Sequence, residues 1–280
     1  TDPKTIFVTT NGGVYASLDS VLTWERVAKE FFSDSKLLPG ISHFHGIAFD
    51  PKDPKRIYVG GGGDQYSPSG VGISISEDGG KNWKQANVGF EVDVHVSKIV
   101  VDKNNPSIIY ATTQGPTNFG EKTGSGYGIF KSTDYGSMWK KVNNGLETVE
   151  TNTIALDPND SNVIYLGTDD DGIYKSSDGG ASWKKLQISQ LPGKYGVGDI
   201  VVDPKNGIVY VATVDYFRLF TARGSVGDHG VYVSRDGGTS WQSFNDGLKH
   251  AGAFALELDD EKGILYVGTR GGGIYWRAVK

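Results

Sequence analysis

Short apolar runs that end in aspartate recur along the chain, and each is followed by a second short run centred on tyrosine. The segment Ile154–Asp157, followed by Ile164–Leu166, is one example. β-branched runs bounded by turn residues predict buried strands. A third run such as Gly172–Ser176 and a fourth that opens with tryptophan, Trp183–Leu186, complete the unit. We therefore expect a four-stranded antiparallel meander repeated along the chain, with no sustained helical period.

The third and fourth runs of each unit are joined by the pattern Ser-x-Asp-x-Gly-x-x-Trp. Four copies are intact, and a degenerate first copy has Val21 in place of the glycine. The aspartates of the five copies are Asp19, Asp78, Asp134, Asp178 and Asp236, and the tryptophans are Trp24, Trp83, Trp139, Trp183 and Trp241. The shortest spacing, from Asp134 to Asp178, is 44 residues. Four-stranded units of about 40–50 residues repeated along a chain predict a β-propeller.

Six such units fit the chain, which predicts one all-β domain over residues 1–280: a six-bladed β-propeller with four-stranded antiparallel blades. The first unit lacks its inner strand. The last unit ends with its third strand, Gly273–Trp276, and lacks an outer strand. Either two blades are three-stranded, or the chain is part of a longer protein. A ring closed by exchanging strands would need each end of the chain to supply the strand that the other end lacks. The two ends of this chain are not obviously complementary in this way.

The residue types of the motif are all explained by turn stability. The aspartate accepts hydrogen bonds from backbone amides of the turn, and serine adds a weaker one. Glycine supplies a positive φ without steric cost. We expect the tryptophan to fold back over its own hairpin. We therefore interpret the five turns as scaffold and not as calcium or catalytic sites.

The four intact motifs make the chain resemble the Asp-box, or BNR-repeat, propellers. That group includes sialidases, xyloglucanase-type glycosidases, sortilin-type receptors and photosystem II assembly propellers. The resemblance extends over essentially the whole chain. It implies the fold and says little about chemistry, because members share turns and not active sites.

The enzymatic relatives imply catalytic residues that this chain matches only in part. The sialidases hold a carboxylate with three arginines, one of them in a Phe-Arg-Ile-Pro segment near the N-terminus, whereas Thr5–Thr9 has none. The nearest similar segment, Tyr216–Phe220, lies in the wrong blade. The xyloglucanase-type frame matches Tyr165–Gly172 and places Asp169 at the catalytic position, without the arginine of that frame. The second carboxylate of those enzymes belongs to another propeller, and the usual glycosidase mechanism needs both.

Composition excludes several classes of function. The chain has 280 residues, a net charge of -5 and no cysteine. The charge and the lack of a basic cluster argue against nucleic acid as a partner. No apolar run is long enough to insert in a membrane. Without cysteine there is no disulfide and no thiolate chemistry, and we expect no cofactor.

Insertions gather at the end of the blades where the second strand meets the third and where one blade leads to the next. Loops on a rigid scaffold are where function is usually found. His43 and His95 occupy equivalent positions, seven residues before an inner-strand aspartate. We consider these two as a metal or acid–base site with His45 and an acid such as Asp93; the alternative is that polar loops simply host polar residues. The further ligand-binding candidates at this end are Glu150, Asp169, Tyr66, Tyr216, Arg218, Arg223 and His229.

Three hypotheses of function follow. We expect a non-catalytic propeller, extracellular or in the cell envelope, that binds a protein, peptide or glycan through its loop-rich face. A glycoside hydrolase acting on a polysaccharide is the alternative. The abrupt ends of the repeat favour a third hypothesis, a module of a larger surface assembly.

Overall fold

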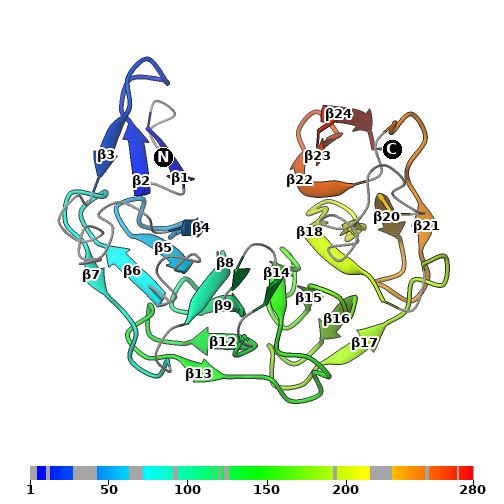
Figure 1. The fold of residues 1–280 in the computed structure, drawn as a ribbon, viewed down its shortest axis with the longest axis horizontal. Helices are drawn as coiled ribbons and strands as arrows, with labels where there is room; N and C mark the ends of the chain where they lie inside the picture. The colour runs from blue at the N-terminus through cyan, green and yellow to red at the C-terminus, as the bar shows by residue number, and fades with distance from the viewer. Residues whose placement is uncertain are drawn as a thin grey trace. The chain divides into compact units, whose positions relative to one another are not determined.

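The computed structural model describes residues 5–10, 13–27, 43–62, 72–90, 94–115, 117–118, 121–122, 126–191, 194–214, 229–249, 252–269 and 271–279. The regular elements of these residues are all β-strands (Figure 1). The chain is a six-bladed β-propeller with antiparallel blades, as the repeat predicts. Two compact units divide it, residues 1–141 and 142–280, and each holds three blades.

The first unit begins with a three-stranded blade and continues with two four-stranded blades. Blade 1 consists of β1 (Ile6–Thr10), β2 (Gly13–Ser17) and β3 (Glu25–Val27). Blade 2 consists of β4 (His43–Phe49), β5 (Ile57–Gly62), β6 (Gly72–Ser76) and β7 (Lys84–Gln85). Blade 3 consists of β8 (His95–Val101), β9 (Ile109–Gln114), β12 (Ile129–Ser132) and β13 (Lys140–Lys141). The insertion after β9 holds a small hairpin of β10 (Thr117–Asn118) and β11 (Glu121–Lys122).

The second unit has two four-stranded blades and ends with a three-stranded one. Blade 4 consists of β14 (Thr151–Leu156), β15 (Ile164–Thr168), β16 (Ile173–Ser176) and β17 (Lys184–Leu186). Blade 5 consists of β18 (Gly196–Val202), β19 (Val209–Val214), β20 (Val231–Ser234) and β21 (Gln242–Ser243). Blade 6 consists of β22 (Ala253–Asp259), β23 (Ile264–Thr269) and β24 (Gly273–Ala278). Among the described residues, blade 1 thus has no inner strand and blade 6 no outer one, as expected.

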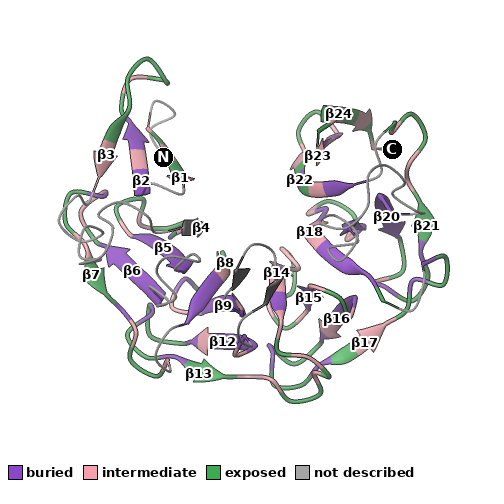
Figure 2. Cartoon of the chain, in the orientation of Figure 1, coloured by how far each residue is buried: buried purple, intermediate pink, exposed green. Residues whose placement is uncertain are grey.

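Burial follows the order of the strands within a blade. In the four-stranded blades the second and third strands are mostly buried, as in β5 and β6, whereas outer strands such as β7 and β13 are exposed (Figure 2). Apolar side chains of neighbouring blades in one unit form common clusters. Ile73 and Ile75 of blade 2, for example, pack with Val96 and Ile99 of blade 3. The core therefore lies between the blades as well as within them.

The serine–aspartate turns form the local network that the sequence predicts. In blade 4, the Ser176 hydroxyl donates to Asp178 Oδ1 at 2.7 Å and accepts from the Gly180 amide at 2.9 Å. The Ser182 amide donates to the same Asp178 oxygen at 2.9 Å. The Ser182 hydroxyl donates to Asp178 Oδ2 at 2.5 Å. This bond most strongly, together with those from the Ser176 hydroxyl and the Ser182 amide, holds the pKa of the Asp178 carboxyl at about 2, below its ordinary 3.8. The carboxylate is therefore fully engaged by its own turn.

The tryptophans extend further than their own hairpins, which corrects part of the expectation. Trp83 does bond within its turn, from its indole nitrogen to the Gly80 carbonyl at 2.9 Å. Trp139 of blade 3 instead donates its indole N–H to the Ala86 carbonyl and its amide to the Val88 carbonyl, both just after the outer strand of blade 2. The local pattern could not reveal this partner, because it lies 53 residues away. The tryptophan is a link between successive blades.

The same docking recurs in the second unit. The Trp183 indole donates to the Val142 carbonyl at 2.7 Å, and its amide donates to the Asn144 carbonyl. Trp241 of blade 5 is buried in the cluster formed with blade 4, and its carbonyl accepts a bond from Gln190. A buried tryptophan typically contributes about 3–5 kcal/mol of stability. Each docked indole therefore ties its blade to the segment that precedes it.

Blade 6 departs from this scheme within its own residues. Arg277 pairs with Leu265 as Ser234 pairs with Val209 in blade 5, so Arg277 occupies the position of the motif serine. Two residues on, Val279 stands where the motif has aspartate. Blade 6 therefore has neither side chain from which the other blades build the turn.

Candidate functional site

The loop-rich end of the blades lies where second strands meet third strands and where blades are connected. Five of the residues predicted for this end lie outside the described residues, and they stay predictions: Tyr66, Asp93, Tyr216, Arg218 and Arg223. His43 and His45 lie on β4, and their side chains are also outside the described part.

His43 and His95 are equivalent in register. Each opens the inner strand of its blade, and they pair with Gly62 and Gln114 respectively. The His95 ring is buried, and a β-carbon placed on Gly62 would lie 2.1 Å from its Nδ1. His95 therefore packs against Gly62 in the second strand of blade 2. Any residue with a β-carbon at position 62 would clash with the histidine ring. Whether His43 and His95 share a ligand stays a prediction.

A bulge lies at one position of every complete inner strand. The register shifts between Phe44 and Gly46 in β4, and at the matching place in β8, β14, β18 and β22. His45 is the skipped residue of β4, and Asn152 is that of β14. The Asn152 side-chain amide donates to the Val197 carbonyl of blade 5 at 2.6 Å. A bulge re-aims the side chain that it carries, and here it directs one to the next blade.

The acidic residues at this end of blade 4 are brought together by its connections. The Asp169 amide donates to the Glu150 carbonyl at 3.1 Å, which joins the turn after β15 to the segment before β14. Asp170 and Asp171 continue that turn, and Glu147 lies at the start of the facing segment. We call these residues the acidic rim: Glu147, Glu150, Asp169, Asp170 and Asp171. The sequence pointed to two of the five, Glu150 and Asp169.

A network of charged and polar side chains lies at the centre of the acidic rim. The Lys185 ammonium pairs with Asp171 and lies 3.4 Å from Glu147. The Tyr174 hydroxyl donates to Asp171 and accepts from the Glu147 amide. Burial raises the pKa of Tyr174, and its bond to Asp171 adds to the shift. Burial acts to lower the pKa of Lys185, but Asp171 and Glu147 outweigh it, so that pKa lies above its ordinary 10.5. Both donors therefore stay protonated at neutral pH, and Asp171 stays engaged.

A second aromatic residue packs against the turn that contains Asp169, Asp170 and Asp171. Tyr195 precedes β18, and its carbonyl accepts a bond from the Gly172 amide at 2.9 Å. Gly172 has φ +77, and a β-carbon there would lie 2.8 Å from the Tyr195 ring. Burial raises the pKa of Tyr195 to about 12. Glycine is thus required at this turn for the tyrosine to lie against it.

Two polar groups were missed from the sequence. Lys185 was part of an ordinary outer strand, and only the fold brings it to Asp171. Asp199 lies buried at the β18 bulge, where it accepts bonds from Thr153 of blade 4 at 3.0 Å and from the Leu256 amide of blade 6 at 3.1 Å. An aspartate inside the apolar run Gly196–Val202 was the available signal. It ties three inner strands together.

Two predictions for the loop-rich end are left: His229 as a ligand-binding residue, and a metal site. His229 is buried just before β20. Across the described ranges, no three histidine, cysteine or acidic side chains are grouped so as to hold a metal ion. The histidine set with Asp93 falls partly outside those ranges, so that hypothesis stays a prediction.

The repeated turns and the blades define the chain as an Asp-box β-propeller. The family model described as "Sortilin, neurotensin receptor 3" (Sortilin-Vps10) matches residues 127–278, and the chain belongs to this family.

Curated relatives are enzymes of which the chain matches only a small part. Xyloglucanase Xgh74A of Acetivibrio thermocellus is 29% identical over 139 residues, 47% of this chain and 15% of the relative. A xyloglucanase of Hypocrea jecorina is 33% identical over 124 residues, 41% of this chain and 13% of the relative. These matches show homology of a propeller segment.

Solved structures confirm the fold. A GH74 enzyme of Niastella koreensis has a TM-score of 0.71 at 20% identity, covering 98% of this chain and 42% of that one. PorZ of Porphyromonas gingivalis, a bacterial surface component of the type-IX secretion system, has a TM-score of 0.66 at 18% identity, covering 98% of this chain and 37% of that one. Within the described residues, no helix is long and apolar enough to cross a membrane.

Proposed function

We propose that this chain is a non-catalytic binding propeller of the cell exterior, and that its acidic rim contacts a polypeptide partner with basic side chains. The observation that carries the proposal is the ion pairing of the rim. Lys185 pairs with Asp171 and Glu147, and Lys194 lies 3.7 Å from Asp170. These pairs place carboxylates and ammonium groups side by side at the loop-rich end of blade 4.

The pairing does not favour the glycosidase alternative. Hydrolysis by the usual route needs one protonated carboxylic acid and a second carboxylate across the scissile bond. A protonated acid near neutral pH requires an apolar or like-charged environment. Asp170 and Asp171, which follow the position that resembles the xyloglucanase aspartate, have ammonium partners instead. The apolar pocket that a general acid of this kind needs is therefore not seen around Asp170 and Asp171, whose carboxylates lie beside ammonium groups.

The charge of the rim indicates the chemistry of the partner. Three carboxylates, those of Glu147, Asp170 and Asp171, pair with the two ammonium groups of Lys185 and Lys194, which leaves one negative charge in excess. The side chains of Glu147 and Asp170 are largely exposed, so they are available to a partner. Complementary charge steers association and selects partners. Among protein, peptide and glycan ligands, this surface favours a polypeptide with lysine or arginine, because most glycans are neutral or acidic.

The relatives support a location outside the cytoplasm. PorZ is by its title a surface component. Another neighbour, with a TM-score of 0.65 at 13% identity, is by its title the extracellular domain of BT4673. We propose the same setting for this chain, as a binding module or as a part of a larger surface assembly.

Binding to a cationic peptide tests the proposal. The probe is a labelled peptide of alternating lysine and serine, followed by fluorescence anisotropy against the 280-residue protein. We expect saturable binding that weakens when ionic strength is raised from about 0.05 to 0.5 M, because salt screens exposed charges. The variant Glu147→Lys/Asp170→Lys should lose binding. Asp260→Lys/Glu261→Lys, two charge reversals in the turn between β22 and β23, is the matched control and should retain most of it.

Two results would contradict the proposal. Equal binding by the rim variant and the control would place the contact elsewhere. Release of sugars from xyloglucan or from aryl glycosides that is lost in Asp169→Asn would restore the enzymatic alternative.

A further inference from the structure

The serine–aspartate turn of blade 3 differs from the other four copies in the residue before the tryptophan. In those copies a side chain at this position donates to the second carboxylate oxygen, Oδ2, of the motif aspartate at 2.5 or 2.6 Å: Thr23, Asn82, Ser182 and Ser240. Blade 3 has Met138 there, which carries no donor. The Ser132 hydroxyl and the Met138 amide both bond to Asp134 Oδ1, and no side chain of the described residues bonds to Oδ2. One oxygen of this carboxylate is therefore available to a donor from outside the turn.

The same turn has a large residue where its backbone is left-handed. Glycine occupies this position in the other intact copies, with φ from 66 to 80: Gly79, Gly179 and Gly237. Blade 3 has Tyr135 there, with φ 59. Bulky residues rarely adopt this conformation, because the backbone crowds the β-carbon. Backbone strain of this kind collects at functional sites, and the turn itself does not call for it, since glycine forms the turn without strain.

Blade 2 fixes the orientation of the Tyr135 ring. The Arg56 guanidinium lies 4.5 Å from the centre of the ring, and Arg56 is itself held by Asp50 at 3.1 Å. With this contact in place Tyr135 is still 43% exposed, and Met138 is 48% exposed. The turn thus presents an oriented aromatic ring and a thioether side chain next to a carboxylate that its own residues satisfy only in part.

The chemistry of this turn indicates a protein partner with a basic side chain. Tyrosine, methionine and arginine are enriched where proteins contact one another. The pKa of the Asp134 carboxyl lies below its ordinary 3.8, chiefly because the Ser132 hydroxyl donates to it, so the carboxylate is charged at neutral pH. A charged donor forms a stronger bond with a carboxylate than a neutral one does. Lysine and arginine supply such a donor, and their apolar stems can pack on a side chain such as Met138.

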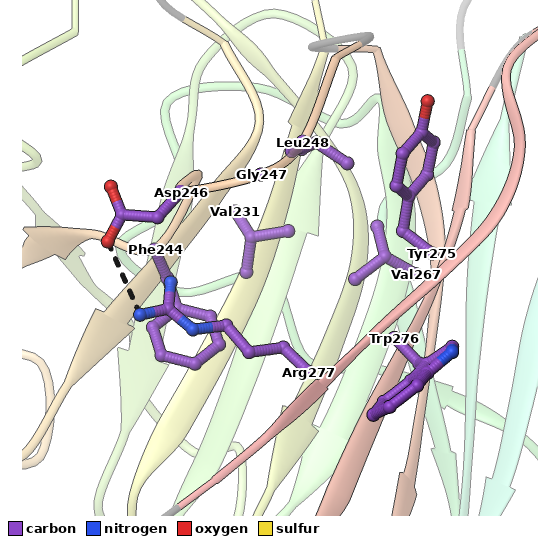
Figure 3. Close-up of a pocket in the computed structure, with 9 residues that line it drawn as sticks. All are labelled: Val231, Phe244, Asp246, Gly247, Leu248, Val267, Tyr275, Trp276 and Arg277. Carbon is purple, nitrogen blue, oxygen red and sulfur yellow. Dashed lines mark hydrogen bonds and ion pairs between the residues drawn. The ribbon is translucent and has the colours of Figure 1, made fainter.

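The chain contains a contact of this kind between its own blades 5 and 6. The Arg277 guanidinium lies 4.1 Å from the centre of the Phe244 ring and 3.3 Å from Asp246 (Figure 3). The Asp246 side chain is 91% exposed. An exposed carboxylate near an aromatic ring therefore holds a basic side chain in this protein.

We propose that the turn of blade 3, with Asp134, Tyr135 and Met138, is a contact site for a partner polypeptide that presents a lysine or arginine flanked by apolar residues. The basic group donates to Asp134 Oδ2, and the flanking residues pack on Tyr135 and Met138. The turn joins the third and fourth strands, so it lies at the end of its blade opposite the loop-rich one. The site is therefore separate from the acidic rim and does not rest on it.

The single methionine of the chain provides a direct readout of this site. In the 280-residue protein, isotope-labelled at the methionine methyl group, the one NMR signal reports on the Met138 side chain. The probe is the capped peptide acetyl-Leu-Lys-Leu-amide, and acetyl-Leu-Gln-Leu-amide is its uncharged counterpart. We expect the lysine peptide to shift the signal to saturation with a Kd on the order of 0.1–1 mM, as for a small contact. The glutamine peptide should bind at least about fivefold more weakly, because its donor is neutral.

A matched pair of protein variants tests the role of the free carboxylate oxygen. Asp134→Asn keeps Oδ1, which accepts both bonds of the turn, and replaces only Oδ2. It should weaken binding of the lysine peptide at least about fivefold. Asp178→Asn makes the same change in the turn where the Ser182 hydroxyl already bonds to Oδ2, and it should leave binding unchanged.

Met138→Ser separates binding from stability. The serine restores the donor that the other copies have, so the variant should melt at a higher temperature than the parent. The same hydroxyl occupies Asp134 Oδ2, so binding of the lysine peptide, followed by saturation transfer from the protein to the peptide, should be lost.

Three outcomes would overturn the proposal. The first is an unchanged methionine signal up to about 10 mM lysine peptide, since such affinity is too weak for a built contact. The second is equal binding of the lysine and glutamine peptides. The third is a shift produced by the neutral disaccharide maltose and not by the peptide, because the ligand would then be a glycan. Failure at this turn leaves the acidic-rim proposal standing, because the methionine signal and the Glu147→Lys/Asp170→Lys variant report on different surfaces.

Discussion

Blade 1 and blade 3 contain the same turn in two different settings. In blade 3, Trp139 is 2% exposed and bonded to blade 2. In blade 1, Trp24 is 42% exposed. The Ser17 hydroxyl nevertheless donates to Asp19 at 2.8 Å, and the Thr23 amide donates to Asp19 at 2.9 Å. These two hydrogen bonds are thus the same with and without a docked tryptophan.

The difference separates two roles within one motif. The serine and aspartate stabilise a local turn, which forms even where Val21, with φ +70, replaces glycine. The tryptophan acts on the preceding blade and is buried only where that blade supplies a place for it. Blade 5 shows the third case, because no atom of the described residues lies within 4 Å of a β-carbon placed on Gly247, whereas Gly89 and Gly145 at the same position contact a tryptophan backbone. The tryptophans of blades 3 and 4 therefore couple each of these blades to the one before it.

The tryptophan should show the largest contrast. Trp139→Ala removes a buried ring and leaves the Ala86 carbonyl without its donor, so we expect a loss of about 3–5 kcal/mol in the free energy of unfolding. Trp24→Ala should cost less than about 1 kcal/mol, as for other exposed positions. Urea denaturation of both variants measures the difference. Equal losses would remove the distinction between docked and undocked copies.

The glycines that follow the outer strands form the next pair. Gly145 and Gly247 have φ of +92 and +84, so alanine causes similar backbone strain at both. Only Gly145→Ala adds a clash with the Trp183 carbonyl. Overpacking costs about 1–3 kcal/mol, and Gly145→Ala should be less stable than Gly247→Ala by that amount. Thermal unfolding of the two variants decides whether the position beside Gly247 is open in solution.

The serine of the motif should contribute equally to stability in blade 1 and in blade 4. Ser176→Ala and Ser17→Ala each leave a turn amide without its acceptor, that of Gly180 and that of Val21 respectively. We expect each to cost about 1–2 kcal/mol. A loss confined to Ser176→Ala would mean that the turn depends on the docked tryptophan after all.

The aspartates predict a smaller effect that depends on pH. The turn bonds hold the pKa of Asp78, Asp178 and Asp236 at about 2, against an ordinary 3.8. A lowered folded-state pKa contributes stability above the unfolded value, and the contribution is lost as pH falls through the folded value. The triple variant Asp78→Asn/Asp178→Asn/Asp236→Asn should therefore be less stable than the parent at pH 5, and the gap should narrow toward pH 2. A gap that widens on acidification would contradict this sign.

The strand order of the blades was predictable because each strand has its own local sequence pattern. Alternating short runs, the aspartates that end the first run of each unit and the position of Trp183 predict four strands without reference to distant residues. The three-stranded state of blades 1 and 6 followed from the same pattern. The contact between Trp139 and Ala86 did not, because two copies of one local sequence differ only in what the previous blade offers.

The candidate site was predictable only in part. Asp169 and Glu150 were visible as polar residues at loop positions. The partners that fix the charges of the rim were not, since Lys185 comes from an outer strand and meets Asp171 across the blade. His95 shows the opposite case: its position was read correctly, but its packing against Gly62 depends on the neighbouring blade.

Hydrogen exchange of the indole N–H groups, followed by NMR, tests the coupling role of the motif most directly. The indoles of Trp139 and Trp183, which donate to Ala86 and Val142, should exchange only on unfolding of their blades. The Trp24 indole should exchange close to the rate of an unprotected group. Similar exchange rates for Trp24 and Trp139 would contradict the account.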